Sequence, residues 1–228
     1  MRLVIKSGGQ EAIPEWRKHF KAYAPNLDWD DPGIDPKTIQ YALVWESEEG
    51  RLAAMSDLRL IISAGPGVDH DIADKMRPSK VPIARMVNAA TAVAMSEYVL
   101  TAALFIVRDF KHIVDNQVKK HWDSFAVSRD ISDMRMGVMG LGDLGAETAS
   151  LLSVVGFQTA DWARSEQTLE GVECFAGLAQ FPRFLERTDI LVCLLPATQA
   201  TNGILCTETL MQLPHGASLI NVGRGSHI

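Results

Sequence analysis

Short apolar runs alternate with longer amphipathic stretches along the chain. In the first series the pattern predicts a helix over 11–23 and strands over 3–5, 42–45, 60–63 and 81–87. Pro82 makes the last of these an edge strand or a strand start, because proline cannot donate to a ladder of hydrogen bonds. Strands that alternate with helices indicate a parallel sheet with right-handed crossovers.

A long helix is expected over 94–118, and a second series of the same kind follows it. The apolar runs of this series predict strands at 136–139, 159–162, 190–195 and 219–222, with helices at 144–155, 178–187 and 208–213. The unbroken apolar run 190–195 is typical of a central strand that is covered on both faces. Two series predict two doubly wound α/β domains, which we place at 1–94 and 95–228.

Composition places the chain among globular proteins. Of its 228 residues, 47% are hydrophobic and 22% are charged, which excludes a disordered chain. The longest apolar stretch, 98–107, is much shorter than the roughly 18 residues that cross a bilayer. The first residues become charged too early for a secretory signal, so we expect no membrane segment and no export.

The net charge and the cysteine content limit the expected binding partners and the expected cellular compartment. The 22 basic and 28 acidic residues give a net charge of −6, and no basic surplus favours nucleic acid or an anionic membrane. Cys174, Cys193 and Cys206 are an odd number of thiols without the spacing of a metal site. We therefore expect free thiols in a reducing cytoplasm and predict no bound metal.

A glycine-rich turn carries the first sign of chemistry. The segment 140–145 fits G-x-G-x-x-G between a predicted strand and a predicted helix, the context that dinucleotide binding requires. The first glycine of such a turn allows a tight bend, the second lets backbone N–H groups reach a pyrophosphate, and the third lets the helix pack closely. The alternative is a glycine-rich turn without a ligand. The candidate cofactor residues of this turn are Gly140, Leu141, Gly142, Asp143, Leu144 and Gly145.

The end of the next predicted strand bears on the choice of cofactor. An acidic residue at this point would bind the ribose hydroxyls of NAD, and Asp161 is a candidate. The following loop, however, holds Arg164 and Ser165, a guanidinium and a hydroxyl that suit the 2′-phosphate of NADP. These residues favour NADP(H), with NAD possible, and the alternative for Arg164 is a solvated loop cation.

Two further turns follow predicted strands, where doubly wound folds bind their ligands. Arg224 comes after the strand 219–222 between two glycines, and an arginine there can hold a carboxylate at two points. The alternative is a surface arginine in a turn. The segment 63–69 ends a strand of the first domain and can offer backbone N–H groups to an anion. Its alternative is an ordinary strand-to-helix turn capped by Asp69.

Together these motifs resemble the D-isomer-specific 2-hydroxyacid dehydrogenases, and within them the glyoxylate/hydroxypyruvate reductase A subgroup. The matching segments are collinear, span nearly the whole chain, and are more specific in combination than singly. They are Ala42-Leu43-Val44-Trp45, Gly65-x-Gly67-Val68-Asp69, Met95-Ser96-Glu97-Tyr98, Gly140 to Gly145, Trp162-x-Arg164-Ser165, Leu194-Leu195-Pro196-x-Thr198-x-x-Thr201 and Asn221-Val222-x-Arg224-Gly225. The resemblance implies a flavodoxin-like substrate domain over 1–94 and a Rossmann dinucleotide-binding domain over 95–228.

The resemblance also implies an activity, the NADPH-dependent reduction of a small 2-oxo acid such as glyoxylate or hydroxypyruvate to a 2-hydroxy acid. It implies that Arg224 binds the substrate carboxylate and polarises the carbonyl, and that Trp45, Gly65 and Gly67 contact the substrate. It implies a homodimer through the long helix after residue 95. Beyond the glycine turn, the cofactor contacts that it implies are at Trp162, Arg164, Ser165, Leu194, Pro196, Thr201, Val222, Gly223 and Arg224.

Two departures from the family pattern matter. Pro66 stands where the family has a backbone N–H available to the substrate, so one carboxylate donor is missing. The family's proton donor, a histidine assisted by a glutamate, lies well after the arginine motif, whereas this chain stops at Ile228, inside the second domain. We interpret His227 and His70 as structural and assign neither to that role. The 228-residue chain is therefore expected to be weak or inactive alone. The alternative is an NADP(H)-binding sensor without turnover.

Overall fold

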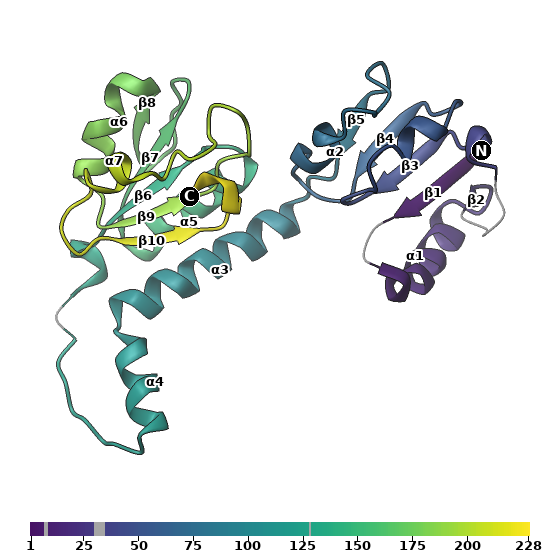
Figure 1. Ribbon diagram of the computed structural model, residues 1–228. Coiled ribbons are helices and arrows are strands. Elements are labelled where there is room, and N and C mark those ends of the chain that lie inside the picture. The colour runs from purple at the N-terminus through teal and green to yellow at the C-terminus, as the bar shows by residue number, and fades with distance from the viewer. Residues whose placement is uncertain (7–8, 30–34, 128) are drawn as a thin grey trace. The chain divides into compact units, whose positions relative to one another are not determined.

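A computed structural model describes residues 1–6, 9–29, 35–127 and 129–228 (Figure 1). The chain divides into two compact units, Met1–Val87 and Asn88–Ile228, and each unit has its own parallel sheet. This division precedes the predicted boundary at residue 95, because the helix that opens the second unit begins at Ala89.

The first unit contains a five-stranded parallel sheet in the order β2-β1-β3-β4-β5. This is the flavodoxin-like order, and it places β5 at an edge, as Pro82 predicts. The apolar pattern did not predict β2, which is only two residues long. The strands are β1 (Arg2–Lys6), β2 (Asp28–Trp29), β3 (Tyr41–Val44), β4 (Leu60–Ser63) and β5 (Ile83–Arg85).

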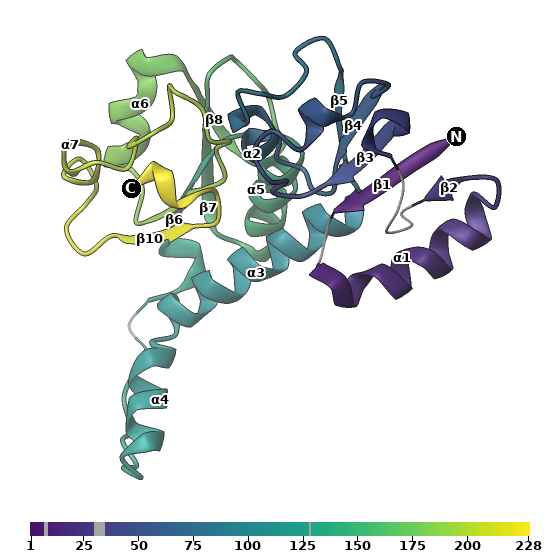
Figure 2. The same ribbon diagram turned by 45° about the vertical axis from the view of Figure 1, so that its right-hand side comes forward.

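Both faces of the first sheet are covered. Alternate residues of β1 point to opposite sides, so Leu3 and Ile5 pack on the side of α1 (Gly9–Tyr23) while Val4 joins the core of the other face. Figures 1 and 2 both show α1 along one side of this sheet. The turn after β4 leads into the short helix α2 (Asp69–Ala73). The described part of this unit also has 3-10 turns at Pro36–Thr38 and Leu52–Ala54.

The second unit contains a five-stranded parallel sheet in the order β10-β9-β6-β7-β8. Counted from β6, this is the Rossmann order, in which the strand sequence reverses between β6 and β9. Every residue of β9 is buried, as its unbroken apolar run predicts. The strands are β6 (Arg135–Met139), β7 (Gln158–Ala163), β8 (Glu173–Ala176), β9 (Ile190–Cys193) and β10 (Ser218–Asn221).

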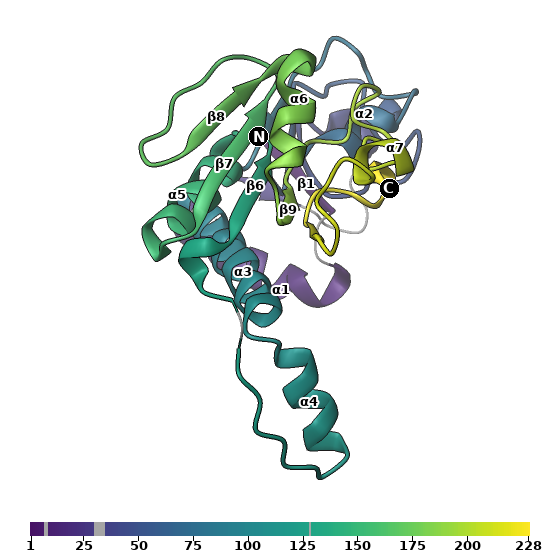
Figure 3. The ribbon, with the colours of Figure 1, turned by 90° about the vertical axis from the view of Figure 1, so that its left-hand side faces the viewer.

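Helices cover both faces of the second sheet, as Figure 3 shows. On one face α3 and α5 pack together over a core that includes Val99, Ala103, Ala149 and Leu152. On the other face α6 covers a core that includes Phe184, Leu185, Leu191 and Cys193. The helices are α3 (Ala89–Val107), α4 (Phe110–Val118), α5 (Asp143–Val155), α6 (Gly177–Glu186) and α7 (Thr207–Leu210), with 3-10 turns at Ile131–Asp133 and Gly225–His227.

The single helix predicted over 94–118 is wrong in its start and in its continuity. The side chain of Asn88 accepts a hydrogen bond from the backbone N–H of Thr91, and this cap starts the helix at Ala89. The helix ends at Val107, because Asp109 adopts a left-handed conformation with φ 50° before α4 begins. Aspartate is one of the few residues besides glycine that tolerate this conformation.

By length and composition, α3 is the one helix among the described residues that could cross a membrane, with a mean hydropathy of 1.7 in its most apolar window. The apolar run 98–107 alone did not predict this, because alanines extend the apolar character towards the start of the helix. Within the second unit Val99, Ala103 and Val107 of α3 are buried in the core, and α3 packs against α5. This packing buries 28% of the apolar window, and Val93, Tyr98 and Phe105 of the same helix stay exposed.

Candidate cofactor and substrate site

The glycine turn joins β6 to α5, and two of its glycines are required by the backbone. Gly140 has φ 101°, a conformation that other residues rarely adopt. A Cβ atom on Gly145 would lie 1.7 Å from the carbonyl oxygen of Gly140, so the helix can start this close to the strand only with glycine there. A Cβ atom on Gly142, by contrast, would meet no atom within 4 Å. Since Leu141 is buried and Leu144 is half-buried, the turn presents mainly backbone to its open side.

This turn lies where the strand order of the second sheet reverses, between β6 and β9. The backbone N–H of Gly140 donates to the carbonyl oxygen of Trp162, and that of Leu194 donates to the carbonyl oxygen of Met139. The loops after β6, β7 and β9 therefore leave from the same edge of the sheet. The first turn of α5 begins at this edge, with Gly142 before it and the exposed Asp143 as its first residue. Crevices at such switch points bind ligands in open α/β sheets.

Arg164 and Ser165 follow β7, and both are exposed. Trp162 differs from them, because its side chain is buried and its indole N–H donates to the carbonyl oxygen of Gly177 at 2.8 Å. Its ring also packs on Phe181, with 4.5 Å between the ring centroids. The side chain of Trp162 therefore holds the strand end against α6, and the cofactor contact that the resemblance implies for this residue stays a prediction.

Asp161 lies inside the sheet rather than at its edge. Its exposed fraction is 0%, so its carboxylate cannot reach a ribose, and its candidacy as the NAD determinant is wrong. Burial raises the pKa of Asp161, and it raises the pKa of Cys174, the partner of Asp161 on β8, to about 11. The nearby Asp161 carboxylate adds to the rise at the thiol. Arg164 and Ser165 are then the first exposed polar side chains after the strand.

The loop after β9 is fixed by Thr201. The hydroxyl of Thr201 donates to the carbonyl oxygen of Pro196 at 2.6 Å and accepts from the backbone N–H of Thr198 at 2.9 Å. Leu194 at the start of this loop is half-buried, and Pro196 is exposed. Because β9 pairs with β6, the loop begins beside the glycine turn.

Arg224 follows β10, the neighbour of β9, and its loop is ordered by hydrogen bonds. The side chain of Asn221 accepts from the backbone N–H of Gly223 at 3.1 Å and donates to the carbonyl oxygen of Arg224 at 3.0 Å. Arg224 is half-buried, and its guanidinium donates to the carbonyl oxygen of Gly223 at 3.0 Å. The backbone N–H of Val222 donates to the carbonyl oxygen of Cys193. Arg224 therefore leaves the sheet from a rigid turn.

In the first unit, the turn after β4 is covered by Trp45. A Cβ atom on Gly65 would lie 2.4 Å from the Trp45 ring, so glycine allows the indole to rest on the turn. The hydroxyl of Ser63 donates to the carbonyl oxygen of Gly67 at 2.8 Å and fixes the far side of the turn. The structure therefore brings Trp45, Gly65 and Gly67 together at the carboxyl end of β4, and Trp45 keeps 37% of its surface exposed.

A buried polar pair supports this turn. The Nε2 atom of His70 lies 3.3 Å from the carboxylate of Asp71 and 3.4 Å from the hydroxyl of Ser63. Burial raises the pKa of Asp71, and His70 opposes that rise. The ring of His70 packs on Trp45 with 4.2 Å between centroids. These contacts agree with a structural role for His70.

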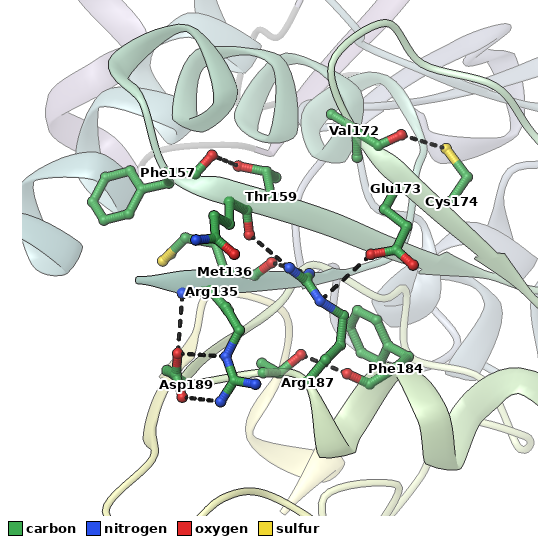
Figure 4. A network of polar contacts seen from close by, with 12 residues as sticks. Arg135, Met136, Phe157, Thr159, Val172, Glu173, Cys174, Phe184, Arg187 and Asp189 are labelled. Atoms are coloured by element: carbon green, nitrogen blue, oxygen red, sulfur yellow. Dashed lines mark hydrogen bonds and ion pairs between the residues drawn. The ribbon is translucent and has the colours of Figure 1, made fainter. Parts of the chain in front are cut away.

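The amino ends of the strands in the second unit carry a separate polar network (Figure 4). Arg135 donates from its guanidinium to both carboxylate oxygens of Asp189, at 2.9 and 2.6 Å. These hydrogen bonds lower the pKa of Asp189, since they stabilise its charged form. Arg187 donates to the carbonyl oxygen of Met136 and lies 3.6 Å from the carboxylate of Glu173. The network joins strand starts and lies at the opposite end of the sheet from the glycine turn.

Four loops of the second unit thus follow neighbouring strands at one edge of the sheet, after β6, β7, β9 and β10. The sequence predicted each of these loops from its motif. The sequence interpretation of His227 as structural agrees with its full burial against the Arg224 loop, but its hydrogen bond to the backbone of Arg224 was not predicted. Among the described residues no group of three or more His, Cys, Asp or Glu side chains is placed to hold a metal ion.

Residues 100–228, which contain all four loops, match the family model of the D-isomer specific 2-hydroxyacid dehydrogenase, NAD binding domain. The chain belongs to the D-isomer specific 2-hydroxyacid dehydrogenase family. Membership agrees with the family that the sequence motifs resemble.

Relatives within the family include glyoxylate/hydroxypyruvate reductase A of Yersinia enterocolitica, which is 32% identical over 199 residues. A solved D-isomer specific 2-hydroxyacid dehydrogenase from Xanthobacter autotrophicus, in complex with NADPH and MES, matches with a TM-score of 0.90 and 36% identity. That match covers 100% of this chain and 73% of the other. The NADPH-dependent glyoxylate/hydroxypyruvate reductase of Sinorhizobium meliloti, solved with NADP and sulfate, matches with a TM-score of 0.86 and 31% identity over 99% of this chain and 73% of its own.

The chain does not span the full length of these relatives. The match to the Yersinia reductase covers 85% of this chain but 63% of that protein.

Proposed function

We propose that the chain binds NADPH and a small 2-oxo acid, and that it serves the reduction of that acid to a 2-hydroxy acid. The observation that carries this proposal is the open backbone at Gly142, held at the switch point of a Rossmann sheet by the close packing of Gly145 on Gly140. The names of the relatives support the reaction class. The NADPH and NADP in the solved relatives support the cofactor.

For the cofactor, the pyrophosphate would lie against Gly142 and the first turn of α5, where backbone N–H groups and the helix dipole favour an anion. Arg164 and Ser165 would bind the 2′-phosphate, because a guanidinium forms paired hydrogen bonds with phosphate oxygens. This loop favours NADP(H) over NAD. The remaining contacts would come from the neighbouring loops, at Leu194, Pro196, Thr201, Val222 and Gly223.

For the substrate, Arg224 would hold the carboxylate with its two-pronged guanidinium and stabilise the negative charge that develops on the carbonyl oxygen. In the first unit, the backbone N–H groups of Gly65 and Gly67 would bind the same kind of anion, and Trp45 would form an apolar wall. Pro66 between them has no N–H to contribute. When bound, NADPH supplies the hydride.

We assign no proton donor among the described residues. The imidazole of His227 is fully buried and engaged by the Arg224 loop, and that of His70 lies between Trp45 and Asp71. Because general acid catalysis typically contributes about 10²–10⁴-fold, slow turnover by the 228-residue chain is consistent with the proposal.

We also propose that the second unit forms a homodimer through α3 and α4. Figure 3 shows α4 projecting away from the sheet of this unit, and the two helices expose several large apolar side chains. Exposed apolar surfaces of this kind mark interaction sites. The side chains are Val93, Tyr98, Phe105, Phe110, Ile113, Val114 and Val118.

The test of the proposed function compares the wild type with Arg224→Lys. This variant keeps the positive charge but loses the planar guanidinium that can form two parallel hydrogen bonds with a carboxylate. NADPH binding is followed by its fluorescence, and glyoxylate is then added while binding and NADPH oxidation are recorded. We expect glyoxylate affinity to fall about tenfold or more in the variant, and NADPH affinity to fall by less, because Arg224 is one of many predicted cofactor contacts. NADPH binding without any response to 2-oxo acids would instead identify a module that senses NADP(H) without turnover.

A further inference from the structure

His227 ends the 3-10 turn Gly225–His227 and is fully buried, with an exposed fraction of 0%. Its Nδ1 atom accepts a hydrogen bond from the backbone N–H of Arg224 at 3.0 Å. A nitrogen that accepts has no proton, so the neutral ring carries its proton on Nε2. The Nε2 atom lies 3.4 Å from the carbonyl oxygen of Pro196, to which it donates. One ring therefore joins the loop after β10 to the loop after β9.

The ring of His227 packs closely against its surroundings. A Cβ atom on Gly223 would lie 2.7 Å from Cε1 of His227, so the glycine next to Arg224 makes room for the imidazole. The backbone of the turn is held as well, because the carbonyl oxygen of His227 accepts from the N–H of Leu205 at 2.7 Å. The thiol of Cys193 lies 3.7 Å from Nδ1 on the β9 side. The ring therefore lies between Gly223 and Cys193, and the backbone of its turn is held by Leu205.

The hydrogen bond to Nδ1 acts on the backbone from which the Arg224 side chain leaves. Arg224 is extended, with φ −135° and ψ 153°, and the residue is half-buried. Without an acceptor at Nδ1, the N–H of Arg224 would lose this partner inside the protein, and the turn would relax towards another one. A change in backbone dihedrals at Arg224 would displace the far end of a long side chain by more than the backbone itself moves.

We propose that His227 is a positioning residue for Arg224: its Nδ1 atom fixes the backbone that aims the guanidinium at a substrate carboxylate. The proposal rests on the proposed function, because it concerns the same carboxylate. It assigns to His227 a role beyond packing. It also explains why the residue before Arg224 is glycine, since any side chain at Gly223 would displace the ring.

The experiment compares two variants that each keep one half of the imidazole. In His227→Asn, the side-chain oxygen can take the place of Nδ1 and accept from the N–H of Arg224. In His227→Gln, the longer amide can take the place of Nε2 and donate to Pro196, but the acceptor for Arg224 is lost. Both variants remove a ring from the core, so their melting temperatures serve as matched controls.

Glyoxylate affinity is measured in the presence of saturating NADPH, and NADPH affinity is measured separately. We expect His227→Gln to weaken glyoxylate binding about tenfold, while His227→Asn stays within about threefold of the wild type and NADPH affinity changes little in both. In an Arg224→Ala background, His227→Gln should cause no further loss of glyoxylate affinity, because a positioning residue acts only through the residue that it positions.

Equal losses in the Asn and Gln variants, or an undiminished effect of His227→Gln in the Arg224→Ala background, would overturn the positioning role while leaving the proposed function intact. A wild type that binds NADPH but gives the same glyoxylate response as Arg224→Ala would overturn the proposed function as well. The ¹⁵N shifts of the His227 ring test the hydrogen bond without any ligand. We expect an unprotonated Nδ1, and a proton on Nδ1 would contradict the proposal even if both variants fail to fold.

Discussion

The glycine turn allows a sharp test, because two of its glycines are required for different reasons. Replacing Gly145 with alanine puts a Cβ atom 1.7 Å from the carbonyl oxygen of Gly140, whereas real Cβ contacts essentially never fall below 3.0 Å. The start of α5 would have to move away from β6 by roughly 1.3 Å, the difference between these distances. Replacing Gly142 with alanine meets no atom within 4 Å and requires no such shift.

The stability lost in Gly145→Ala follows from the clash with Gly140 and from the helix propensity of alanine. Overpacking in a close-packed core costs about 1–3 kcal/mol and sometimes more, and the better helix propensity of alanine offsets at most about 1 kcal/mol. We therefore expect Gly145→Ala to lower the free energy of unfolding by about 2 kcal/mol. For a unit of this size, that is a fall in melting temperature of roughly 4–8 °C. Gly142→Ala should stay within about 0.5 kcal/mol of the wild type.

The assay is thermal unfolding of both variants, with and without NADPH. Gly142→Ala should keep its melting temperature but lose most of the stabilisation that NADPH gives the wild type, because a methyl group blocks the approach of the pyrophosphate. An unchanged melting temperature for Gly145→Ala would refute the packing argument. Full stabilisation of Gly142→Ala by NADPH would refute the assignment of that open backbone to the cofactor.

Three further predictions concern single side chains. Burial raises the folded-state pKa of Asp161, so the contribution of this residue to the free energy of unfolding should fall as the pH rises above about 4. The free energy of unfolding of Asp161→Asn should therefore rise relative to that of the wild type as the pH is raised from about 4 to neutrality. A difference between the two proteins that does not change with pH would contradict this. Pro66→Ala adds a backbone N–H and should lower the glyoxylate KM, whereas an unchanged KM would count against a missing donor. Iodoacetamide at about pH 8 should label the exposed Cys206 and spare Cys174, whose pKa burial raises to about 11; peptide mass spectrometry showing equal labelling would disprove this.

The fold was largely predictable because parallel strands buried on both faces are continuous apolar runs. Such runs identified β6 and β9, and the alternation of strands with helices predicted that the sheet is parallel. β8 (Glu173–Ala176) was not predicted, because it begins with a charged residue and lies at an edge where only one neighbour pairs with it. The break at Asp109 was not predicted either, since a single left-handed residue interrupts an apolar pattern that otherwise continues.

The candidate site was predictable where its chemistry lies in short contiguous motifs. The glycine turn and the Arg164 loop are of this kind. Long-range contacts were not predictable, because they depend on which side of a strand a residue faces in the folded sheet. Asp161 is separated from Arg164 by two residues yet is buried inside the sheet, and His227 donates to Pro196, which lies 31 residues earlier in the chain.

The central claim is that this chain binds NADPH at the glycine turn and the Arg164 loop. Measuring the affinity for both cofactors by titration tests it most directly. NADPH and NADH are each titrated against the wild type and against Arg164→Ala. We expect the wild type to bind NADPH more tightly than NADH. The variant should lose about 10- to 100-fold in NADPH affinity, because a charge-assisted pair with phosphate is lost, and should keep its NADH affinity within about twofold. An equal loss for both cofactors, or no binding of either by the wild type, would contradict the account.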